Sequence, residues 1–582
     1  MSHRPVFRSL VHTAAALIAA AALLSAQTQT GTSQVAVGTT SAVATAHPLA
    51  TKAALTMLAK GGNAVDAAVA AAFAIGVVEP DGSGLGGGGG MLIFLGPEKK
   101  SLYINYYQRA GERLEELPYD REEDRQSVRA SLVPGTVAGL CGALEQFGSL
   151  PLAVVLEPAI RYAEEGFAID ATLAKIILDN FELLEKDSAT SSIYLDEGFP
   201  RAEGDRLTQP ALASTLRLIA QNGRAGFYEG TVAQTIVQET SQRGAVFTLD
   251  DFKNYREIVT EPVKGTYRGY DVLSAAVPQS GAAVIEALNI LENVPLGELG
   301  HPTVSVESLH LMAEALRRTY ADRSAYIADP LFEQFPLKGL LSKPYALERF
   351  LDINMERATP PRYRDTKPGK PEKFEKESDS RDPRDDGFRR LDLAEADGGG
   401  HTTHLVVVDR NGSMVSLTQT LGTFFGSGMT TAGVLMNNAR SNFARTVQVN
   451  AARAGKQPRS SISPTILVKD GIPVLAVGSP GSARIVSTVV QLITNVVDFG
   501  MDAAQANDAP RFFCQKFEDY LYLENRYSQE IRAELEAKGH ALEIYGDYDL
   551  FFGGAQMILF DPATRTYQAS ADPRRGGAAA AD

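Results

Sequence analysis

The chain has 582 residues and a mass of 62.4 kDa; 44% of its residues are hydrophobic and 22% are charged, as in a globular protein with substantial cores. Its 56 basic and 70 acidic residues leave a formal net charge of −14, which argues against a nucleic-acid partner. Two cysteines, Cys141 and Cys514, cannot build a disulfide framework, and no CxxC pair indicates zinc or thiol redox chemistry. We therefore expect a soluble globular enzyme.

The first 26 residues have the order of a secretory signal peptide. Arg4 and Arg8 precede an apolar run at 11–24, and Ser25 and Ala26 follow it. The run is shorter than the roughly 20 residues of a membrane span, although a retained anchor is the alternative. We predict export to the periplasm or the medium, with no membrane span after the signal is removed.

The mature sequence begins with two helices and a glycine tract. The helical pattern at 53–60 stops at Gly61, and Asn63 can cap a second, Ala-rich helix that continues to Ile75. The glycine tract at 86–90 lacks the GK[ST] ending of a phosphate loop and precedes a strand rather than a helix. It therefore predicts close backbone packing, and we expect no nucleotide cofactor.

Composition divides the rest of the chain in two. Residues 150–350 are mostly helical in pattern, and a stretch rich in Pro and charged residues at about 359–400 predicts a flexible linker. Strand-rich sequence follows, with a hairpin turn at Asn411-Gly412. A mixed sheet covered by helices, in the α+β class, fits this order. The segment after Asp572 is small and polar, which predicts a frayed tail.

The sequence GGGHTTHLVVVD joins the linker to a strand, and chain cleavage is easiest at such a junction. A cut before Thr402 would place a hydroxyl nucleophile and an α-amine base on one residue. The amine has a reference pKa of about 7.7 to 8.0, close to what such a base needs. The alternative is an ordinary strand that begins with two threonines.

Two further features near this strand carry possible chemistry. His401 and His404 are three residues apart and would point to opposite faces of a strand, so we expect no metal site. In GSPGSARI, Gly481 and Ser482 open a helix whose free N–H groups can stabilise a developing oxyanion. The alternative for this second feature is a plain strand-to-helix turn.

These pieces, in this order, resemble the γ-glutamyltransferase family of N-terminal nucleophile hydrolases. The matching stretches lie between about residues 36 and 515 and are KGGNAVDAAVA, LGGGGGM, SLVPGTVAGL, MAEALRRTYADRS, TTHLVVVD, PRSSISPTI, GSPGSARI and ANDAPRF. The resemblance implies an αββα sandwich made as a precursor that cleaves itself between His401 and Thr402. It also implies a large chain (27–401) and a small catalytic chain (402–582) that remain associated as a heterodimer.

The resemblance assigns roles to residues of the small chain. Thr402 aligns with the nucleophile, and Thr420 aligns with the threonine that orients its hydroxyl. A two-residue turn at 411–412 would pair Thr403 with Thr420, so a β-bulge is expected to bring Thr402 opposite Thr420 instead. The remaining assignments are the oxyanion hole, at Gly481 and Ser482, and the serines that hold the donor's α-carboxylate, at Ser460 and Ser461.

The part of the family pattern that recognises the α-amino acid is altered. Tyr107 stands where the family has an Arg that pairs with the α-carboxylate, and Arg109 is a candidate replacement on the same strand face. Asn442 replaces an acidic residue that holds the substrate ammonium, Ala439 replaces a polar side chain, and Gly422 stands where many members have Asn. Loss of the charge weakens an ammonium contact by roughly 1.5 to 3 kcal/mol.

The resemblance implies a hydrolase or transferase that takes a small γ-glutamyl substrate and passes its acyl group to water or an amine, without a cofactor. The altered recognition residues leave open an amidase of the same fold with another acyl specificity, such as a glutaryl or poly-γ-glutamate type. A non-catalytic homologue that retains the fold is a third reading, against which the retained Thr402 and Thr420 argue.

Overall fold

The computed structural model describes residues 34–116, 118–375, 400–444, 449–515 and 519–582. The predicted signal peptide at 1–26 and the larger part of the predicted linker, at 376–399, lie outside these residues. Within the described ranges, every helix is too short or too polar to cross a bilayer.

Two seven-stranded antiparallel sheets form the centre of the unit that spans residues 33–582. In spatial order, the first sheet contains β23 (Ala578–Ala581), β2 (Ala42–Thr45), β12 (Gly400–Val408), β13 (Met414–Thr423), β3 (Gly88–Leu95), β4 (Lys100–Tyr106) and β9 (Ile258–Thr260). The second contains β1 (Gln34–Gly38), β22 (Thr566–Ala571), β21 (Gln556–Asp561), β17 (Ile472–Gly478), β16 (Thr465–Lys469), β11 (Tyr270–Ser274) and β10 (Val263–Tyr267).

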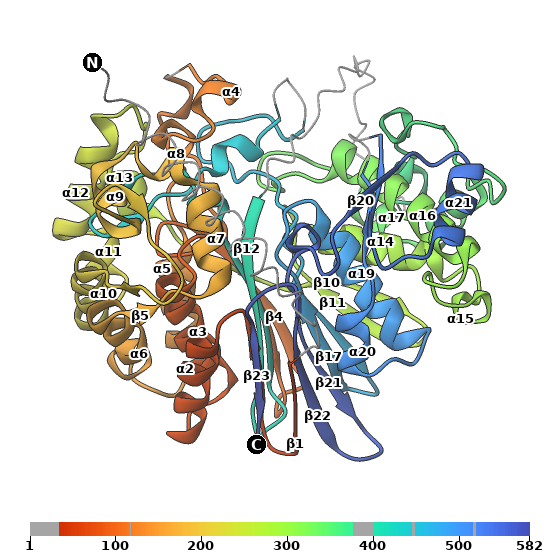
Figure 1. Cartoon of the computed structure of the whole chain (residues 1–582), viewed down its shortest axis with the longest axis horizontal. Helices are drawn as coiled ribbons and strands as arrows, with labels where there is room; N and C mark the ends of the chain where they lie inside the picture. Colours follow the sequence, from red (N-terminus) through yellow and green to blue (C-terminus); the bar gives the residue numbers. More distant parts are fainter. Residues whose placement is uncertain (1–33, 117, 376–399, 445–448, 516–518) are drawn as a thin grey trace, which may run out of the picture. The chain divides into compact units, whose positions relative to one another are not determined.

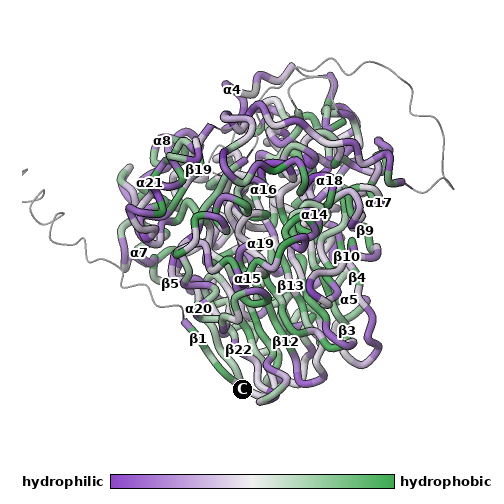
Figure 2. Tube along the Cα trace, turned by 90° about the vertical axis from the view of Figure 1, so that its right-hand side faces the viewer, coloured by the Kyte–Doolittle hydropathy of each residue, from purple (hydrophilic) through white to green (hydrophobic). Residues whose placement is uncertain are grey.

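The central strands β12 and β13 are buried on both faces, and Figure 2 shows green tubes where they are labelled. In β12, Val406 and Val408 join a buried cluster with Ile558 of the opposite sheet. The intervening Leu405 and Val407 belong instead to a cluster with helical residues. Because side chains alternate along a strand, one face of each sheet packs against the other sheet and the other face packs against helices.

Helices cover the two outer faces of the paired sheets (Figure 1). On the first sheet they are α2 (Pro48–Ala59), α3 (Ala64–Val78) and α5 (Thr136–Phe147), with α6 (Leu152–Glu165) packed on α3 and α10 (Pro210–Asn222) packed on α6. On the second sheet they are α14 (Gly281–Leu291), α16 (Val306–Tyr326) and α19 (Arg484–Val497). Further elements include α7 (Ala171–Asp179), α12 (Gly230–Ser241), α18 (Lys343–Leu351), α20 (Ala503–Asp508) and α21 (Gln529–Ala537). The expected αββα sandwich is confirmed.

Segments from both sides of residue 401 contribute to each sheet. β12 and β13 lie between β2 and β3, while β10 and β11 pair through β11 with β16. A break of the chain before Thr402 would therefore leave two pieces joined by ladders of backbone hydrogen bonds and by shared cores.

The predicted frayed tail after Asp572 is wrong. Residues 578–581 form β23, which pairs with β2 along its whole length. Before it, Arg574 is fully buried against Glu524 and Asp572, and Arg575 is buried beside Glu79. Small side chains do not prevent a strand whose backbone hydrogen bonds and flanking ion pairs are supplied by distant segments.

The predicted linker starts too early. Residues 359–375 pack against the helices of the second sheet: Tyr363 is buried and hydrogen-bonds His540, and Gly369 bonds Asp322 through its backbone N–H. The high Pro and charge content of this stretch is compatible with order because its few apolar groups find partners in neighbouring helices.

Candidate active site

The candidate nucleophile lies at a bulge near the start of β12. The predicted two-residue turn would have paired Thr403 with Thr420, but the connection is longer and Thr403 pairs with Gln419. The register then shifts between His401 and Thr403, so that His401 lies opposite Gly422. The expected bulge is confirmed, and it places Thr402 against Thr420, as the resemblance implies.

Three hydrogen bonds fix the hydroxyl of Thr420 in this bulge. Thr402 Oγ1 donates to Thr420 Oγ1 over 3.2 Å, and the backbone N–H of Gly422 donates to the same oxygen over 2.9 Å. Thr420 Oγ1 in turn donates to the carbonyl oxygen of His401 over 2.6 Å. One hydroxyl therefore orients the nucleophile and polarises the peptide bond between His401 and Thr402.

The glycine tract supports β13 behind this group. Gly88 pairs with Thr420, and a Cβ on Gly87 would lie 2.4 Å from the Thr420 carbonyl oxygen. A Cβ on Gly89 would be equally close to the carbonyl of Thr418. No side chain fits at these distances, so the prediction of close backbone packing is confirmed.

Arg575 lies beneath the nucleophile and was missed from the sequence, because the tail gave no signal of burial. Its Nη1 donates to the carbonyl oxygen of Thr402 over 2.8 Å. The same guanidinium pairs with Glu79 at 2.5 Å and Asp81 at 3.2 Å. Burial raises the pKa of Glu79 to about 7, against the opposite effect of the neighbouring Arg575. Arg575 thus brings positive charge to within hydrogen-bond distance of Thr402.

The two histidines of the strand are held separately. The His401 ring stacks on Phe424 with 3.5 Å between centroids, while His404 bonds Thr418 through Nδ1 over 2.9 Å. Burial, with the charges of Arg575 and another nearby arginine, lowers the pKa of His401 well below its usual value. Burial lowers the pKa of His404 to about 3. Both rings are therefore neutral at pH 7.

Among the described residues, ligand atoms close enough to hold a metal ion occur at His310, Glu314 and His540, and neither strand histidine belongs to this cluster. Glu314 is already paired with the buried guanidinium groups of Arg317 and Arg318. Two adjacent positive charges disfavour a cation there, so we assign this cluster a structural role.

The predicted oxyanion turn lies between the end of β17 at Gly478 and the start of α19 at Arg484. Gly481 has φ of +122° and Ser482 has φ of +52°, so both adopt conformations that favour glycine. Ser482 therefore adopts a backbone conformation that is more strained for it than for glycine. Backbone strain held in a turn before a helix N-terminus is common where N–H groups are aimed at a reacting atom.

Four of the residues expected to bind substrate come together. The Tyr107 hydroxyl accepts a hydrogen bond from Asn442 Nδ2 over 2.9 Å and also bonds Ser460. Next to Ser460, Ser461 Oγ accepts a hydrogen bond from Nη2 of Arg323 over 3.0 Å. We call Tyr107, Asn442, Ser460 and Ser461 the recognition wall; Arg323 behind it was missed from the sequence.

Arg109 does not join this wall. Its guanidinium lies over the ring of Tyr255, 5.3 Å from the centroid. The prediction assumed strand alternation from Tyr107 to Arg109, but β4 ends at Tyr106. Beyond that point, alternation no longer determines the face of a side chain, so the reason for placing Arg109 on the same face as Tyr107 does not hold.

Two other departures from the family pattern have a structural reason. Gly422 has φ of +110°, and a Cβ on it would lie 2.1 Å from Asn438 Oδ1. Asn438 Oδ1 accepts a hydrogen bond from the backbone N–H of Thr423 over 3.0 Å, so the amide occupies this space. Ala439, which follows, is fully buried. Asn438 is therefore a further residue of the site that sequence reasoning missed.

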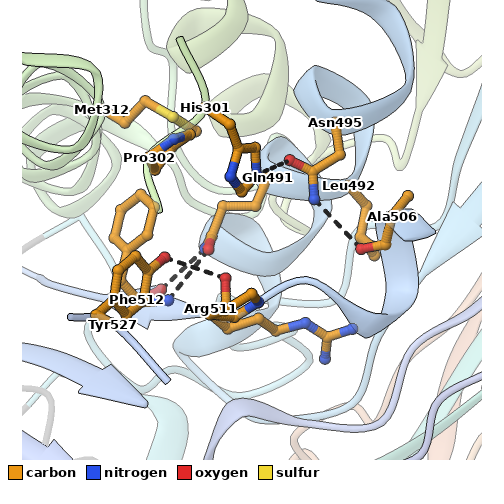
Figure 3. Close-up of a pocket in the computed structure, with 11 residues that line it drawn as sticks. His301, Pro302, Met312, Gln491, Leu492, Asn495, Ala506, Arg511, Phe512 and Tyr527 are labelled. Atoms are coloured by element: carbon orange, nitrogen blue, oxygen red, sulfur yellow. Dashed lines mark hydrogen bonds between the residues drawn. The ribbon is translucent and has the colours of Figure 1, made fainter. Parts of the chain in front are cut away.

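Figure 3 shows a separate small pocket whose lining contains none of the predicted site residues. His301 bonds Asn495 across it over 3.1 Å, and Gln491 bonds both backbone groups of Phe512. These polar groups satisfy one another, so the pocket offers no evident ligand chemistry.

Comparison with known proteins agrees with this geometry. The sequence model of the gamma-glutamyltranspeptidase family matches residues 50–582. The chain is 36% identical over 560 residues to the glutathione hydrolase proenzyme of Bacillus subtilis (strain 168), covering 94% of this chain and 92% of that protein. It is 34% identical over 545 residues to the acylase ACY 1 proenzyme of Pseudomonas sp. (strain V22), covering 90% and 91%. The crystal structure of cephalosporin acylase from Bacillus halodurans has a TM-score of 0.82 and 29% identity, with 94% and 97% covered.

Proposed function

Because this chain belongs to the γ-glutamyltranspeptidase family and has the fold of N-terminal nucleophile hydrolases, we propose that it is an exported, self-cleaving amidase whose nucleophile is Thr402. The observation that carries the proposal is the hydrogen-bonded series from Thr402 through Thr420 to the carbonyl of His401. A strand-initiating threonine needs no such arrangement.

Self-cleavage follows from this series. Thr402 Oγ1 attacks the carbonyl carbon of His401, and the hydroxyl of Thr420 stabilises the charge that develops on the carbonyl oxygen. The peptide C–N bond breaks, the nitrogen takes up the proton of the attacking hydroxyl, and an ester joins the two residues. Water then hydrolyses the ester, which leaves a carboxylate on His401 and a free hydroxyl and α-amine on Thr402.

The liberated amine is the base of the turnover reaction. It accepts the proton of the Thr402 hydroxyl as the oxygen attacks a substrate amide, and the departing amine takes that proton. The N–H groups of the turn at 481–482 stabilise the tetrahedral oxyanion. Arg575, bonded to the carbonyl of the same residue, disfavours protonation of the α-amine and so keeps the base available. Water or an acceptor amine then releases the acyl group.

We propose γ-glutamyl compounds of the glutathione type as the donor class. Support comes from the glutathione hydrolase relatives and from the serine pair of the recognition wall, which can bond a carboxylate. One observation favours a second candidate, a glutaryl-type acyl group without an α-ammonium: Asn442, which bonds the Tyr107 hydroxyl, presents an uncharged amide where an ammonium needs an anion. Relatives named as acylases are consistent with it.

Two measurements test these proposals. Denaturing electrophoresis with N-terminal sequencing should show two fragments, the smaller beginning at Thr402. A single uncut chain that turns over amides would contradict the assigned nucleophile. Comparison of γ-glutamyl and glutaryl anilides then decides between the donor classes, since faster glutaryl cleavage would favour the second candidate.

A further inference from the structure

A buried arginine lies directly behind the recognition wall. Arg323, in the last turn of α16, is 3% exposed, and its Nη2 donates to Ser461 Oγ over 3.0 Å. Its Nε donates over 2.7 Å to Ser280 Oγ, at the N-cap of α14. Ser280 Oγ in turn donates to the carbonyl oxygen of Ser460 over 2.6 Å. The guanidinium is therefore fixed by two helices against both serines.

The charge of Arg323 reaches the front of the wall. Burial raises the pKa of Tyr107, while hydrogen bonds from Ser460 and Asn442 and the charge of Arg323 act in the opposite direction. Arg109, the alternative cation, lies over Tyr255 instead. The guanidinium that bonds Ser461, and that reaches Ser460 through Ser280, thus comes from α16 rather than from the segment after β4.

We propose that Arg323 determines specificity by supplying the positive charge that selects an acyl donor with a terminal carboxylate. The carboxylate would bind at the Ser460–Ser461 hydroxyls, with Arg323 Nη2 behind Ser461. The inference rests on the proposed function, because it assumes that Thr402 attacks an amide whose acyl chain reaches the wall. For this recognition the acyl donor needs a carboxylate but no α-ammonium group.

We expect the positive charge of Arg323 to affect the choice of acyl donor more than its hydrogen bonds to the turn do. A buried guanidinium donates charge-assisted hydrogen bonds, which are roughly twice as strong as neutral ones, and a low-dielectric surrounding extends its field. A neutral donor such as Asn or Gln would hold the turn at 459–462 equally well. Only a cation distinguishes a donor that carries a carboxylate from one of the same length that lacks it.

The test compares two donors of equal length, glutaryl p-nitroanilide and pentanoyl p-nitroanilide, on processed protein. In Arg323→Met, KM for the glutaryl donor should rise about 10- to 100-fold, with kcat changed little. The value of kcat/KM for the pentanoyl donor should stay within about twofold of wild type. Arg323→Lys keeps the charge, so its KM for the glutaryl donor should rise less.

Equal losses for both donors in Arg323→Met and Arg323→Lys would show that the arginine only supports the turn, and would overturn the inference. So would an unchanged KM for the glutaryl donor in Arg323→Met. Electrophoresis of each variant for the two fragments shows whether the fold and self-cleavage survive. If the wild-type protein is processed but cleaves no carboxylate-bearing anilide, the proposed function is refuted, and the inference that rests on it is overturned as well.

Discussion

The end of the β12–β13 hairpin and the recognition wall are two parts of the proposed site, built in different ways. At the hairpin, one sheet register and one bulge determine the positions of Thr402 and Thr420. The glycines behind them leave no room for a side chain. At the wall, the contacting groups are side chains from separate segments: the end of β4, the short helix Ala439–Asn442, the loop at 459–462 and α16.

This difference separates chemistry from specificity. A register cannot change by a small amount, so the hairpin keeps its catalytic geometry or loses it entirely. Side chains on separate segments can be exchanged one at a time, as the family arginine is by Tyr107 here. We therefore expect substitutions at the hairpin to affect every substrate alike, and substitutions at the wall to affect substrates differently.

The largest effect is expected from Thr402→Ala. Without the hydroxyl neither self-cleavage nor acyl transfer can occur, so the protein should remain one chain and kcat should fall by more than about 10⁴-fold. Electrophoresis and a p-nitroanilide assay check both. Thr402→Ser, which keeps a hydroxyl, should still be processed; fragments in the Ala variant would refute the role of Thr402.

Arg575→Met removes the cation beside the hairpin and leaves Glu79 and Asp81 buried without it. The free energy of unfolding should fall by about 3 kcal/mol, and self-cleavage should slow because Arg575 no longer holds the carbonyl of Thr402 in place. Denaturant titration and a time course of fragment appearance measure the two effects. The double variant Arg575→Met with Glu79→Gln should recover part of the stability but not the rate. Normal processing in the single variant would show that Arg575 does not position Thr402 for self-cleavage.

Thr420→Val removes the hydroxyl that bonds the nucleophile but preserves shape. We expect kcat to fall about 100-fold, equally for γ-glutamyl and glutaryl donors. Thr420→Ser serves as the matched control and should retain most activity. A fall in kcat for only one of the two donors would contradict the proposal that the hairpin governs catalysis and the wall governs specificity.

Asn442→Asp introduces an anion at the wall. The ratio of kcat/KM for γ-glutamyl over glutaryl donors should increase about 10-fold, because the ammonium gains a charge-assisted partner. Assays with γ-glutamyl and glutaryl anilides provide the measurement, and Asn442→Gln is the uncharged control. An equal change in both variants would point to shape rather than charge.

The smallest effect is expected from Ser482→Gly. Relief of the positive φ, offset in part by the greater entropy of glycine in the unfolded chain, should stabilise the protein by about 0.5–1 kcal/mol. Urea unfolding in the uncut Thr402→Ala background avoids dissociation of fragments. Ser482→Ala keeps the strained backbone and should show no gain; a gain of equal size there would implicate the hydroxyl instead.

Several local predictions succeed because their causes lie close together in the chain. Asn63 caps α3 and forms a capping box with Asp66, as the residues after Gly62 indicate. The hairpin and its bulge are also correct. The pairing is displaced by one residue, however, because the turn after Val408 is longer than the Asn411-Gly412 pair suggests.

Adjacent residues are enough to identify the nucleophile candidate, the glycine tract behind it and the turn before α19. Three-dimensional packing was needed to show that Arg575 supports Thr402, that Arg323 lies behind Ser461 and that Arg109 points elsewhere. The physical reason is distance along the chain: the first two contacts join residues more than a hundred positions apart, and the third depends on where a strand stops. Burying a charged side chain costs free energy unless an oppositely charged partner is buried with it. The residues next to that charge in the sequence do not show which distant residue is the partner.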